Sequence, residues 1–464
     1  MIDLLIKGGI VVDGDGQRQT DVLIKDSCIR EVGPDIKPAG ECRVINAGGM
    51  YVMPGMIDAH THYHLVSRGT VTADSFPEGS RCAAFGGVTA VVDFADHDKK
   101  TSLLGSTKER LQEMKGQMAV DYALHEGVYG MKDQIELELE HLKDFGVTAI
   151  KLFTTYKNVG YMIDNPDELD RLFSCCRSLK IMVCVHCEAD DLIQKINESW
   201  NGSYLPKDHA LLRPAEVEAR GIQIVGELAL KHHMPLYIVH LSSEKGLSMV
   251  RNLRSRGAHL VVETTPHYLF LDRSKLEGPK GPLYVMTPPL RDREDNLALQ
   301  GALVNGEIQV VATDHCSFTY EQKLESHDCR TIYPGIPGTE ELFVLLHTFA
   351  VQSGRIPVEK AVSLVTENPA RAFGLYPRKG AIKPGSDGDV VIFDPREEWV
   401  ISNKNIHSAS GYSVYDGFHV MGKVKMTIRR GEILVENGQY FGKPGSGVFL
   451  KAGASEYYSN LTFS

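Results

Sequence analysis

The chain has 464 residues, with 50 Lys and Arg against 60 Asp and Glu, so its formal net charge is -10. This acidic balance, without a long basic run, argues against nucleic acid or an anionic membrane as a partner. The length exceeds that of a typical single domain but fits one (β/α)8 barrel with a small attached domain.

The beginning of the chain, from Met1 to Gly9, lacks the basic segment, the longer apolar core and the cleavage site of a signal peptide. No apolar stretch reaches the ~18 residues that indicate a membrane span. The nine cysteines are scattered over the chain, and without an export signal they indicate reduced thiols. We therefore expect a cytoplasmic protein.

Both ends of the chain have the pattern of short β-strands. Residues 1–53 contain apolar runs such as Leu4–Ile6 and Ile10–Val12, separated by Gly and Asp turns. The same pattern returns over 381–440. Two β-rich ends around an α/β middle predict one small β-sandwich built from both chain ends. Residues 441–464 predict an extended C-terminal arm.

The middle of the chain, residues 54–380, alternates apolar runs with amphipathic helical patterns. The runs predict strands near 56–59, 88–94, 119–124, 147–152, 181–186, 236–240, 259–264 and 308–313. Helical patterns such as Gln134–Phe145 and Ala215–His232 lie between most of them. Eight strands with helical crossovers predict an α/β fold, namely a closed (β/α)8 TIM barrel rather than an open doubly wound sheet. We expect this barrel to be the catalytic domain.

Six chemically active side chains lie at the downstream ends of these apolar runs. They are His60, His62, Lys151, His186, His240 and Asp314. Because a parallel barrel carries its chemistry at the C-terminal ends of its strands, we expect these side chains to meet. The i, i+2 pair at the first strand end points to one side and can reach one ion. Four histidines and an aspartate are typical of a hydrolytic site with two divalent ions.

Lys151 is the unusual member of this set. A protonated lysine would repel divalent cations, and a lone lysine in this setting is more often a side chain that snorkels at a strand mouth. It becomes a ligand if it carries CO2 as a carbamate, whose two oxygens can bridge two ions about 3.5–4 Å apart. The surrounding ligands favour the carbamate.

Nine motifs in order along the chain resemble those of the cyclic amidohydrolases, specifically the hydantoinase and dihydropyrimidinase branch. They are Gly55–His62, Gly146–Phe153, Val185–Glu188, Tyr237–Ser242, Glu263–Tyr268, Met286–Arg291, Thr313–Cys316, Glu367–Gly374 and Gly385–Asp389. The resemblance covers nearly the whole chain. It implies a barrel plus a β-sandwich, a binuclear site with two divalent ions, usually Zn2+ with Mn2+ as the alternative, and a homotetramer.

By position, the resemblance divides the ligands between the two ions. The more buried ion would bind His60, His62 and Asp314, and the more exposed ion would bind the other two histidines. Lys151, carboxylated by CO2 to N6-carboxylysine, would bridge both.

The resemblance also implies three residues that bind the substrate. Tyr156 matches the family tyrosine five residues after the bridging lysine. Thr287 stands where the branch usually has serine, in a segment that binds the substrate amide through backbone groups. Pro334 stands where the family commonly has asparagine. A carbonyl contact to the substrate could survive there, but an N–H contact could not, because proline has no N–H.

The function implied is hydrolysis of the cyclic amide bond of 5-substituted hydantoins or dihydropyrimidines to N-carbamoyl amino acids, so the partner is a small cyclic ureide. A hydroxide that bridges the two ions would attack the ring carbonyl. Tyr156 would donate a hydrogen bond to the developing oxyanion, and Asp314 would carry the proton to the leaving nitrogen.

Two alternatives stay open. The first is an allantoinase or another cyclic amidase of the superfamily, such as a dihydroorotase. Dihydroorotases usually carry arginine where His64 stands, and allantoinases often carry an acidic stretch where this chain has Leu65–Gly69. The second, a non-catalytic scaffold of the dihydropyrimidinase-related type, is distant because all six ligand positions are filled.

Overall fold

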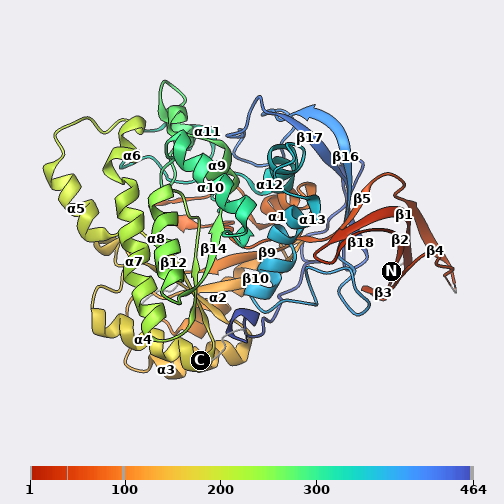
Figure 1. Ribbon diagram of the computed structural model, residues 1–464, viewed down its shortest axis with the longest axis horizontal. Coiled ribbons are helices and arrows are strands. Elements are labelled where there is room, and N and C mark those ends of the chain that lie inside the picture. The colour runs from red at the N-terminus through yellow and green to blue at the C-terminus, as the bar shows by residue number, and fades with distance from the viewer. Residues whose placement is uncertain (1–2, 39, 97–99, 460–464) are drawn as a thin grey trace.

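The computed structural model describes residues 3–38, 40–96 and 100–459 and shows a barrel wrapped by helices, with a β-rich lobe beside it (Figure 1). Eight parallel strands form the barrel in the order β15–β14–β13–β12–β11–β10–β9–β6. They are β6 (Met56–Asp58), β9 (Val88–Ala95), β10 (Asp121–Gly127), β11 (Ala149–Phe153), β12 (Met182–His186), β13 (Pro235–Ile238), β14 (His259–Thr264) and β15 (Val310–Val311). Pairing of Thr61 with His315 joins the first strand end to the last and closes the ring.

Helices surround the barrel, and some of them lie at its C-terminal mouth. They are α1 (Phe76–Phe85), α2 (Leu103–Met114), α3 (Ile135–Phe145), α4 (Pro166–Leu179), α5 (Asp190–Ser199), α6 (His209–Leu212), α7 (Ala215–Lys231), α8 (Glu244–Ser255), α9 (Pro266–Phe270), α10 (Arg293–Asn305), α11 (Tyr320–Leu324), α12 (Leu342–Leu346), α13 (Val358–Val365) and α14 (Glu367–Ala372), with a 3-10 turn η5 (Thr339–Glu341) before α12. In the described part of the chain, no helix is long and apolar enough to cross a membrane.

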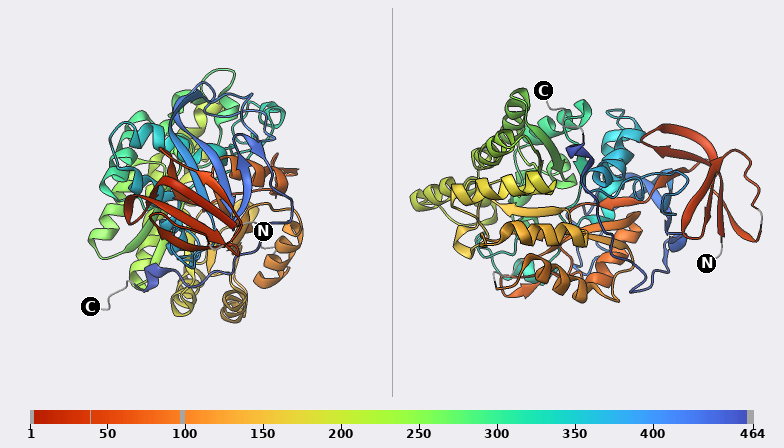
Figure 2. Two further views of the ribbon diagram at one scale, coloured as in Figure 1. Left: turned by 90° about the vertical axis from the view of Figure 1, so that its right-hand side faces the viewer. Right: turned by 90° about the horizontal axis from the view of Figure 1, so that it is seen from below.

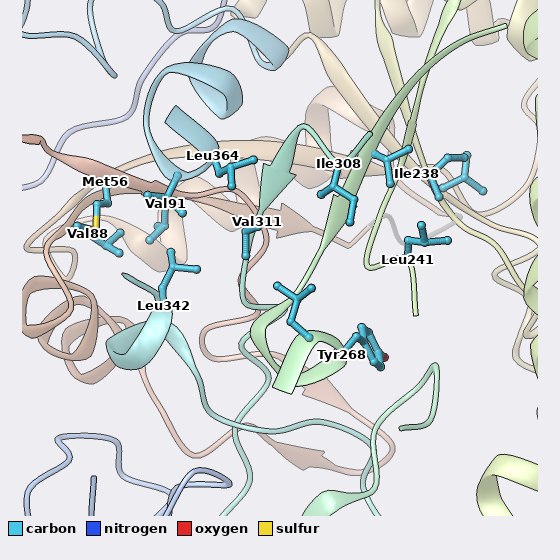
Figure 3. Close-up of a cluster of buried hydrophobic side chains, with 14 of the residues drawn as sticks. Met56, Val88, Val91, Ile238, Leu241, Tyr268, Ile308, Val311, Leu342 and Leu364 are labelled. Carbon is cyan, nitrogen blue, oxygen red and sulfur yellow. The ribbon is translucent and has the colours of Figure 1, made fainter. Parts of the chain in front are cut away.

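The core has an outer and an inner part. The outer part lies between strands and helices, where Met56 and Val91 from the barrel pack with Leu342 and Leu364 from α12 and α13 (Figure 3). The inner part fills the barrel with mostly small side chains such as Ala123. Both faces of each strand are therefore covered, which explains why the strands read as continuous apolar runs.

The two chain ends meet in one nine-stranded sheet, in the order β19–β18–β17–β16–β5–β1–β2–β3 with β4 beside β1 (Figure 2). Its strands are β1 (Asp3–Asp13), β2 (Gly16–Lys25), β3 (Cys28–Gly33), β4 (Cys42–Asn46), β5 (Tyr51–Pro54), β16 (Val390–Val400), β17 (His419–Arg429), β18 (Glu432–Glu436) and β19 (Gln439–Tyr440). Val52 of β5 lies opposite Ile392 of β16. Val11, Val22 and Ile428 share one core, so the predicted sandwich from both chain ends is confirmed.

The residues after β19 run along the barrel as an extended segment. Leu450 N donates to Tyr122 O at 2.7 Å, and Tyr122 N donates to Val448 O at 3.0 Å, so this segment pairs with β10. The predicted domain limits at 53/54, 380/381 and 440/441 stay a prediction, because buried side chains of the barrel and of the nine-stranded sheet, such as Val88 and Val391, belong to one core.

Candidate active site

The structure brings the six predicted ligands to one cavity of about 700 Å³ at the C-terminal mouth of the barrel. Five of them stand at or after the end of a barrel strand, as the pattern of apolar runs predicts, whereas Lys151 lies within β11, two residues before its end. The strands and their ligands are β6 with His60 and His62, β11 with Lys151, β12 with His186, β13 with His240, and β15 with Asp314.

His60, His62 and Asp314 form the tightest group. Asp314 Oδ1 lies 3.1 Å from Nε2 of each histidine, and ligand atoms of the three residues lie within 4.8 Å of one another. Burial opposes ionisation of Asp314, but the positive potential of the imidazoles holds its pKa well below the ordinary value. Two ring nitrogens and a carboxylate oxygen at this spacing fit a divalent cation.

His186 and His240 complete the set of imidazoles. Their ring centroids are 4.7 Å apart, and the centroid of His240 is 5.6 Å from that of His60. Nε2 of His186 lies 2.7 Å from Glu188 Oε2, so Nδ1 is the nitrogen left for a cation. Burial lowers the pKa of both histidines, which favours the neutral imidazole that binds metals.

Lys151 is 2% exposed and, within the described residues, makes no hydrogen bond or ion pair. Its Nζ lies 5.4 Å from the ring centroid of Phe94 and 5.2 Å from that of Phe153. Burial lowers its pKa and so favours the unprotonated amine, which is the form that adds CO2. A buried ammonium that no carboxylate contacts directly is costly, so this environment disfavours the charged lysine.

The backbone at three site residues is left-handed. The φ angles are 65° at Tyr156, 40° at His240 and 50° at Asp314, in a region that residues other than glycine seldom adopt. Near Asp314 the strain is held by Asp58 at the end of β6, whose Oδ1 accepts the Thr313 N–H at 3.0 Å. This bond ties the last strand end to the first.

The model of the amidohydrolase family matches residues 51–434. The chain belongs to the amidohydrolase family. This amidohydrolase is 38% identical over 456 residues to a D-hydantoinase of Ralstonia pickettii, covering 97% of this chain and 99% of that protein. It is 36% identical over 457 residues to a D-phenylhydantoinase of Escherichia coli O1:K1, covering 97% and 98%. The crystal structure of dihydropyrimidinase from Brevibacillus agri matches with a TM-score of 0.94 at 33% identity, covering 98% of this chain and 99% of that chain.

These likenesses confirm the branch that the nine motifs predict. The amidohydrolase is an enzyme of the hydantoinase and dihydropyrimidinase type, which hydrolyses cyclic amides. The family depends on metal ions, and the group of His60, His62 and Asp314 has the donors and the spacing that such an ion needs.

The amidohydrolase cavity is bounded by two backbone segments that carry predicted substrate-binding residues. Met286 and Thr287 of one segment and Pro334 of the other line the cavity. Gly335 N donates to Val285 O at 3.1 Å and so joins the two. We call 285–287 and 333–335 the wall segments.

Tyr156 lines the same cavity. Its ring centroid lies 5.6 Å from that of His186 and 5.3 Å from Cζ of Arg213. Burial raises the pKa of Tyr156 above its ordinary value, so the hydroxyl stays protonated and can donate a hydrogen bond.

Three further residues, Glu188, Arg213 and Glu263, support the site without having been predicted. Glu188 Oε2 lies 3.2 Å from Arg213 Nη2 as well as beside His186. Glu188 and Glu263 are both fully buried. A signal for the two glutamates was present, because Glu188 stands two residues after a ligand and Glu263 lies at the downstream end of an apolar run, as the ligands do. Arg213 precedes helix α7 and carries no such signal.

A second group of carboxylates, Asp121, Asp387 and Asp389, lies near the N-terminal end of β10, away from the strand ends that carry the ligands. Nζ of Lys379 lies 2.7, 3.0 and 2.7 Å from them. Burial would lower the pKa of Lys379, but the carboxylates raise it above its ordinary value. The ammonium supplies the positive charge here, so this group is a buried ion-pair network and not a metal site.

Proposed function

We propose that this amidohydrolase opens 5-substituted hydantoins or dihydropyrimidines at the cyclic amide bond and releases N-carbamoyl amino acids. The observation that carries the proposal is the single cavity in which four histidines, Asp314 and Lys151 meet beside Tyr156. Relatives of nearly the same length that are named D-hydantoinase, D-phenylhydantoinase and dihydropyrimidinase support this class of ring.

The donor set fits two divalent ions. We assign one ion to His60, His62 and Asp314 and the other to the remaining two histidines, with Lys151 as N6-carboxylysine bridging both. We propose Zn2+, with Mn2+ as the alternative, because imidazole and carboxylate donors suit these ions. When bound, the ions supply a water of lowered pKa and polarise the ring carbonyl.

Two side chains of the cavity would then handle charge and protons. Asp314 stays ionised because its pKa is low, so it can take a proton from the attacking water and deliver it to the leaving ring nitrogen. Tyr156 is a protonated donor in the same cavity, and its hydroxyl would stabilise the oxygen on which negative charge develops.

The wall segments would orient the ring. The carbonyls of Tyr333 and Gly335 already accept hydrogen bonds from Lys323, at 2.7 and 2.9 Å. The carbonyl of Pro334 lies between these two and accepts no hydrogen bond from the described residues, so it is the one left for a substrate N–H. The backbone of Thr287 would bind the substrate amide from the neighbouring segment.

We further propose that the enzyme is a cytoplasmic homotetramer that binds neither nucleic acid nor membrane. The net charge of -10 supports the lack of an anionic partner. All nine cysteines are free thiols, which suits a reducing compartment. The tetramer rests on the family resemblance.

A substrate panel tests the proposal. It contains dihydrouracil, hydantoin, D- and L-5-phenylhydantoin, allantoin and dihydroorotate, each with and without Zn2+ or Mn2+ and bicarbonate. We expect metal-dependent opening of a hydantoin or dihydropyrimidine. In Lys151→Ala we expect a loss of about 1000-fold, because removal of a bridging ligand takes away several kcal/mol of charge stabilisation. Turnover of allantoin or dihydroorotate alone would favour another cyclic amidase. No turnover by metal-loaded protein would favour the scaffold.

A further inference from the structure

Lys323 of helix α11 is completely buried. Among the described residues, no carboxylate pairs with it. Instead its Nζ donates three hydrogen bonds to backbone carbonyls, at 2.7 Å to Val285, 2.7 Å to Tyr333 and 2.9 Å to Gly335. An ammonium has three N–H donors, so all of them are used.

All three acceptors belong to the wall segments. Val285 stands directly before Met286–Thr287, and the other two carbonyls flank Pro334. Met286, Thr287, Pro334 and Gly335 line the catalytic cavity, whereas Lys323 does not. The ammonium therefore joins, from outside the cavity, the two stretches of backbone that face the substrate.

The wall segment 333–335 is also packed against the residues that follow the predicted ligand Asp314. A Cβ at Gly335 would lie 2.4 Å from the carbonyl oxygen of Cys316, two residues after Asp314. Cys316 N donates to Ile336 O at 3.0 Å. Segment 333–335 is therefore anchored at the strand end that carries Asp314.

The residue before Lys323 holds a third cavity-lining segment. Gln322 Nε2 donates to Thr70 Oγ1 at 2.7 Å and to Val71 O at 3.1 Å. These residues form β8 (Thr70–Val71), which pairs with β7 (Val66–Ser67) in a hairpin whose Arg68 lines the cavity. Helix α11 thus contacts both walls and the hairpin.

We propose that Lys323 is a positioning residue for substrate recognition, which fixes the spacing of the wall segments 285–287 and 333–335 without touching the substrate. A buried charge with only neutral acceptors is an expensive way to stabilise a fold, and Lys379 shows the cheaper arrangement with three carboxylates. Burial lowers the pKa of Lys323 to about 7, while the three carbonyls favour the charged form. The identity of the substrate in this inference rests on the proposed function.

Lys323→Met tests the inference, because it removes the three donors and keeps most of the apolar volume. Lys379→Met is the matched control, since it also removes a buried ammonium with three contacts, but far from the cavity. Two quantities are measured on metal-loaded protein: hydrogen exchange of peptides covering 283–289 and 331–338, and KM and kcat for the best ring of the panel. Lys323→Gln, which keeps a polar end group, is measured with the same two readouts. If Lys323→Met does not fold, the exchange and KM of Lys323→Gln test the inference.

We expect exchange in both peptides of Lys323→Met to be faster by about tenfold or more. KM should rise by about tenfold while kcat changes by less than about threefold, because the loss is one of binding. Lys379→Met should lower Tm but leave both readouts unchanged. Unchanged exchange in the two peptides would overturn the inference, and so would faster exchange with an unchanged KM. If the wild type opens no ring while exchange still rises in Lys323→Met, the substrate assignment fails and the fixing of the walls by Lys323 stands.

Discussion

Glu263 Oε1 lies 2.9 Å from Nδ1 of His60, and both side chains are buried. The same oxygen accepts the backbone N–H of His240 at 3.0 Å, and Oε2 accepts the hydroxyl of Tyr237 at 2.7 Å. The carboxylate therefore holds the proton of His60 on Nδ1 and leaves Nε2 for a cation. Glu263 thus orients the imidazole of His60 and also the strand end that carries His240.

Glu263→Gln should weaken metal binding by about 10–100-fold, the range typical for the partners of ligating histidines. The amide keeps the size of the side chain but loses the charge that makes the imidazole a stronger donor. Zinc affinity is measured by competition with a chelator. Glu341→Gln is the control. Glu341 is also a buried carboxylate, but the side chain that donates to it, at 2.7 Å, is the hydroxyl of Ser413 and not a predicted ligand. Equal affinities of wild type and Glu263→Gln would contradict the assigned role.

Tyr156→Phe should lower kcat by about 100–1000-fold, because it removes one donor to the developing oxyanion. KM should change much less, since the hydrogen bond strengthens only as charge develops. Steady-state kinetics on the preferred ring measures both, and metal content is determined on the same samples. A rise in KM with kcat unchanged would show that the hydroxyl binds the substrate and not the transition state.

The positions of the ligands can be predicted from the sequence because the functional side chains of a parallel barrel lie at the C-terminal ends of its apolar strands. His186 ends β12 as predicted, and helices α3 and α7 begin and end within one residue of their predicted limits. Strand β15 (Val310–Val311) is shorter than predicted, although Gln309 N and Ala312 N on either side still donate to Val262 O and Thr264 O of β14. The chain leaves the ladder there because Asp58 accepts the Thr313 N–H in place of a neighbouring strand.

The supports of the cavity walls do not follow from the sequence. Lys323 lies in a short polar helix, where lysine normally faces water, and its first acceptor, Val285, is 38 residues away. Nothing in the local pattern distinguishes it from an exposed lysine. Arg213 is similar, because its partners Glu188 and Tyr156 come from two other strand ends. Such residues are set by tertiary contacts, which a periodic pattern does not encode.

Gly221 lets helix α7 approach the strand end of His186. A Cβ at this position would lie 2.6 Å from Glu188 N and 2.6 Å from the carbonyl carbon of Cys187. Gly221→Ala should therefore lower the free energy of unfolding by about 1–3 kcal/mol, because the helix or strand must shift. Gly301→Ala in helix α10 is the control: no atom lies within 4 Å of its Cβ, and alanine should stabilise the helix by up to about 1 kcal/mol. Urea unfolding measures both, and stabilisation by Gly221→Ala would show that α7 can move away freely.

Glu341 makes the stability depend on pH. Burial, and secondarily the charge of Glu340, raise the pKa of Glu341 from 4.5 to about 7. The folded state therefore holds this proton more tightly than the unfolded state. The resulting stabilisation is fully present below about pH 4.5 and is lost as the pH rises towards 7.

Glu341→Gln stays neutral at every pH and should escape this loss. The free energy of unfolding of the variant, relative to wild type, should rise by about 3 kcal/mol between pH 4.5 and 7 and then level off. Urea unfolding of both proteins at a series of pH values gives this difference, in which titrating groups that do not interact with Glu341 cancel because the two chains share them. The amide can still accept the hydroxyl of Ser413, so the variant tests the charge and not the contact. A difference that is independent of pH would mean that Glu341 ionises at its ordinary pKa in the folded protein.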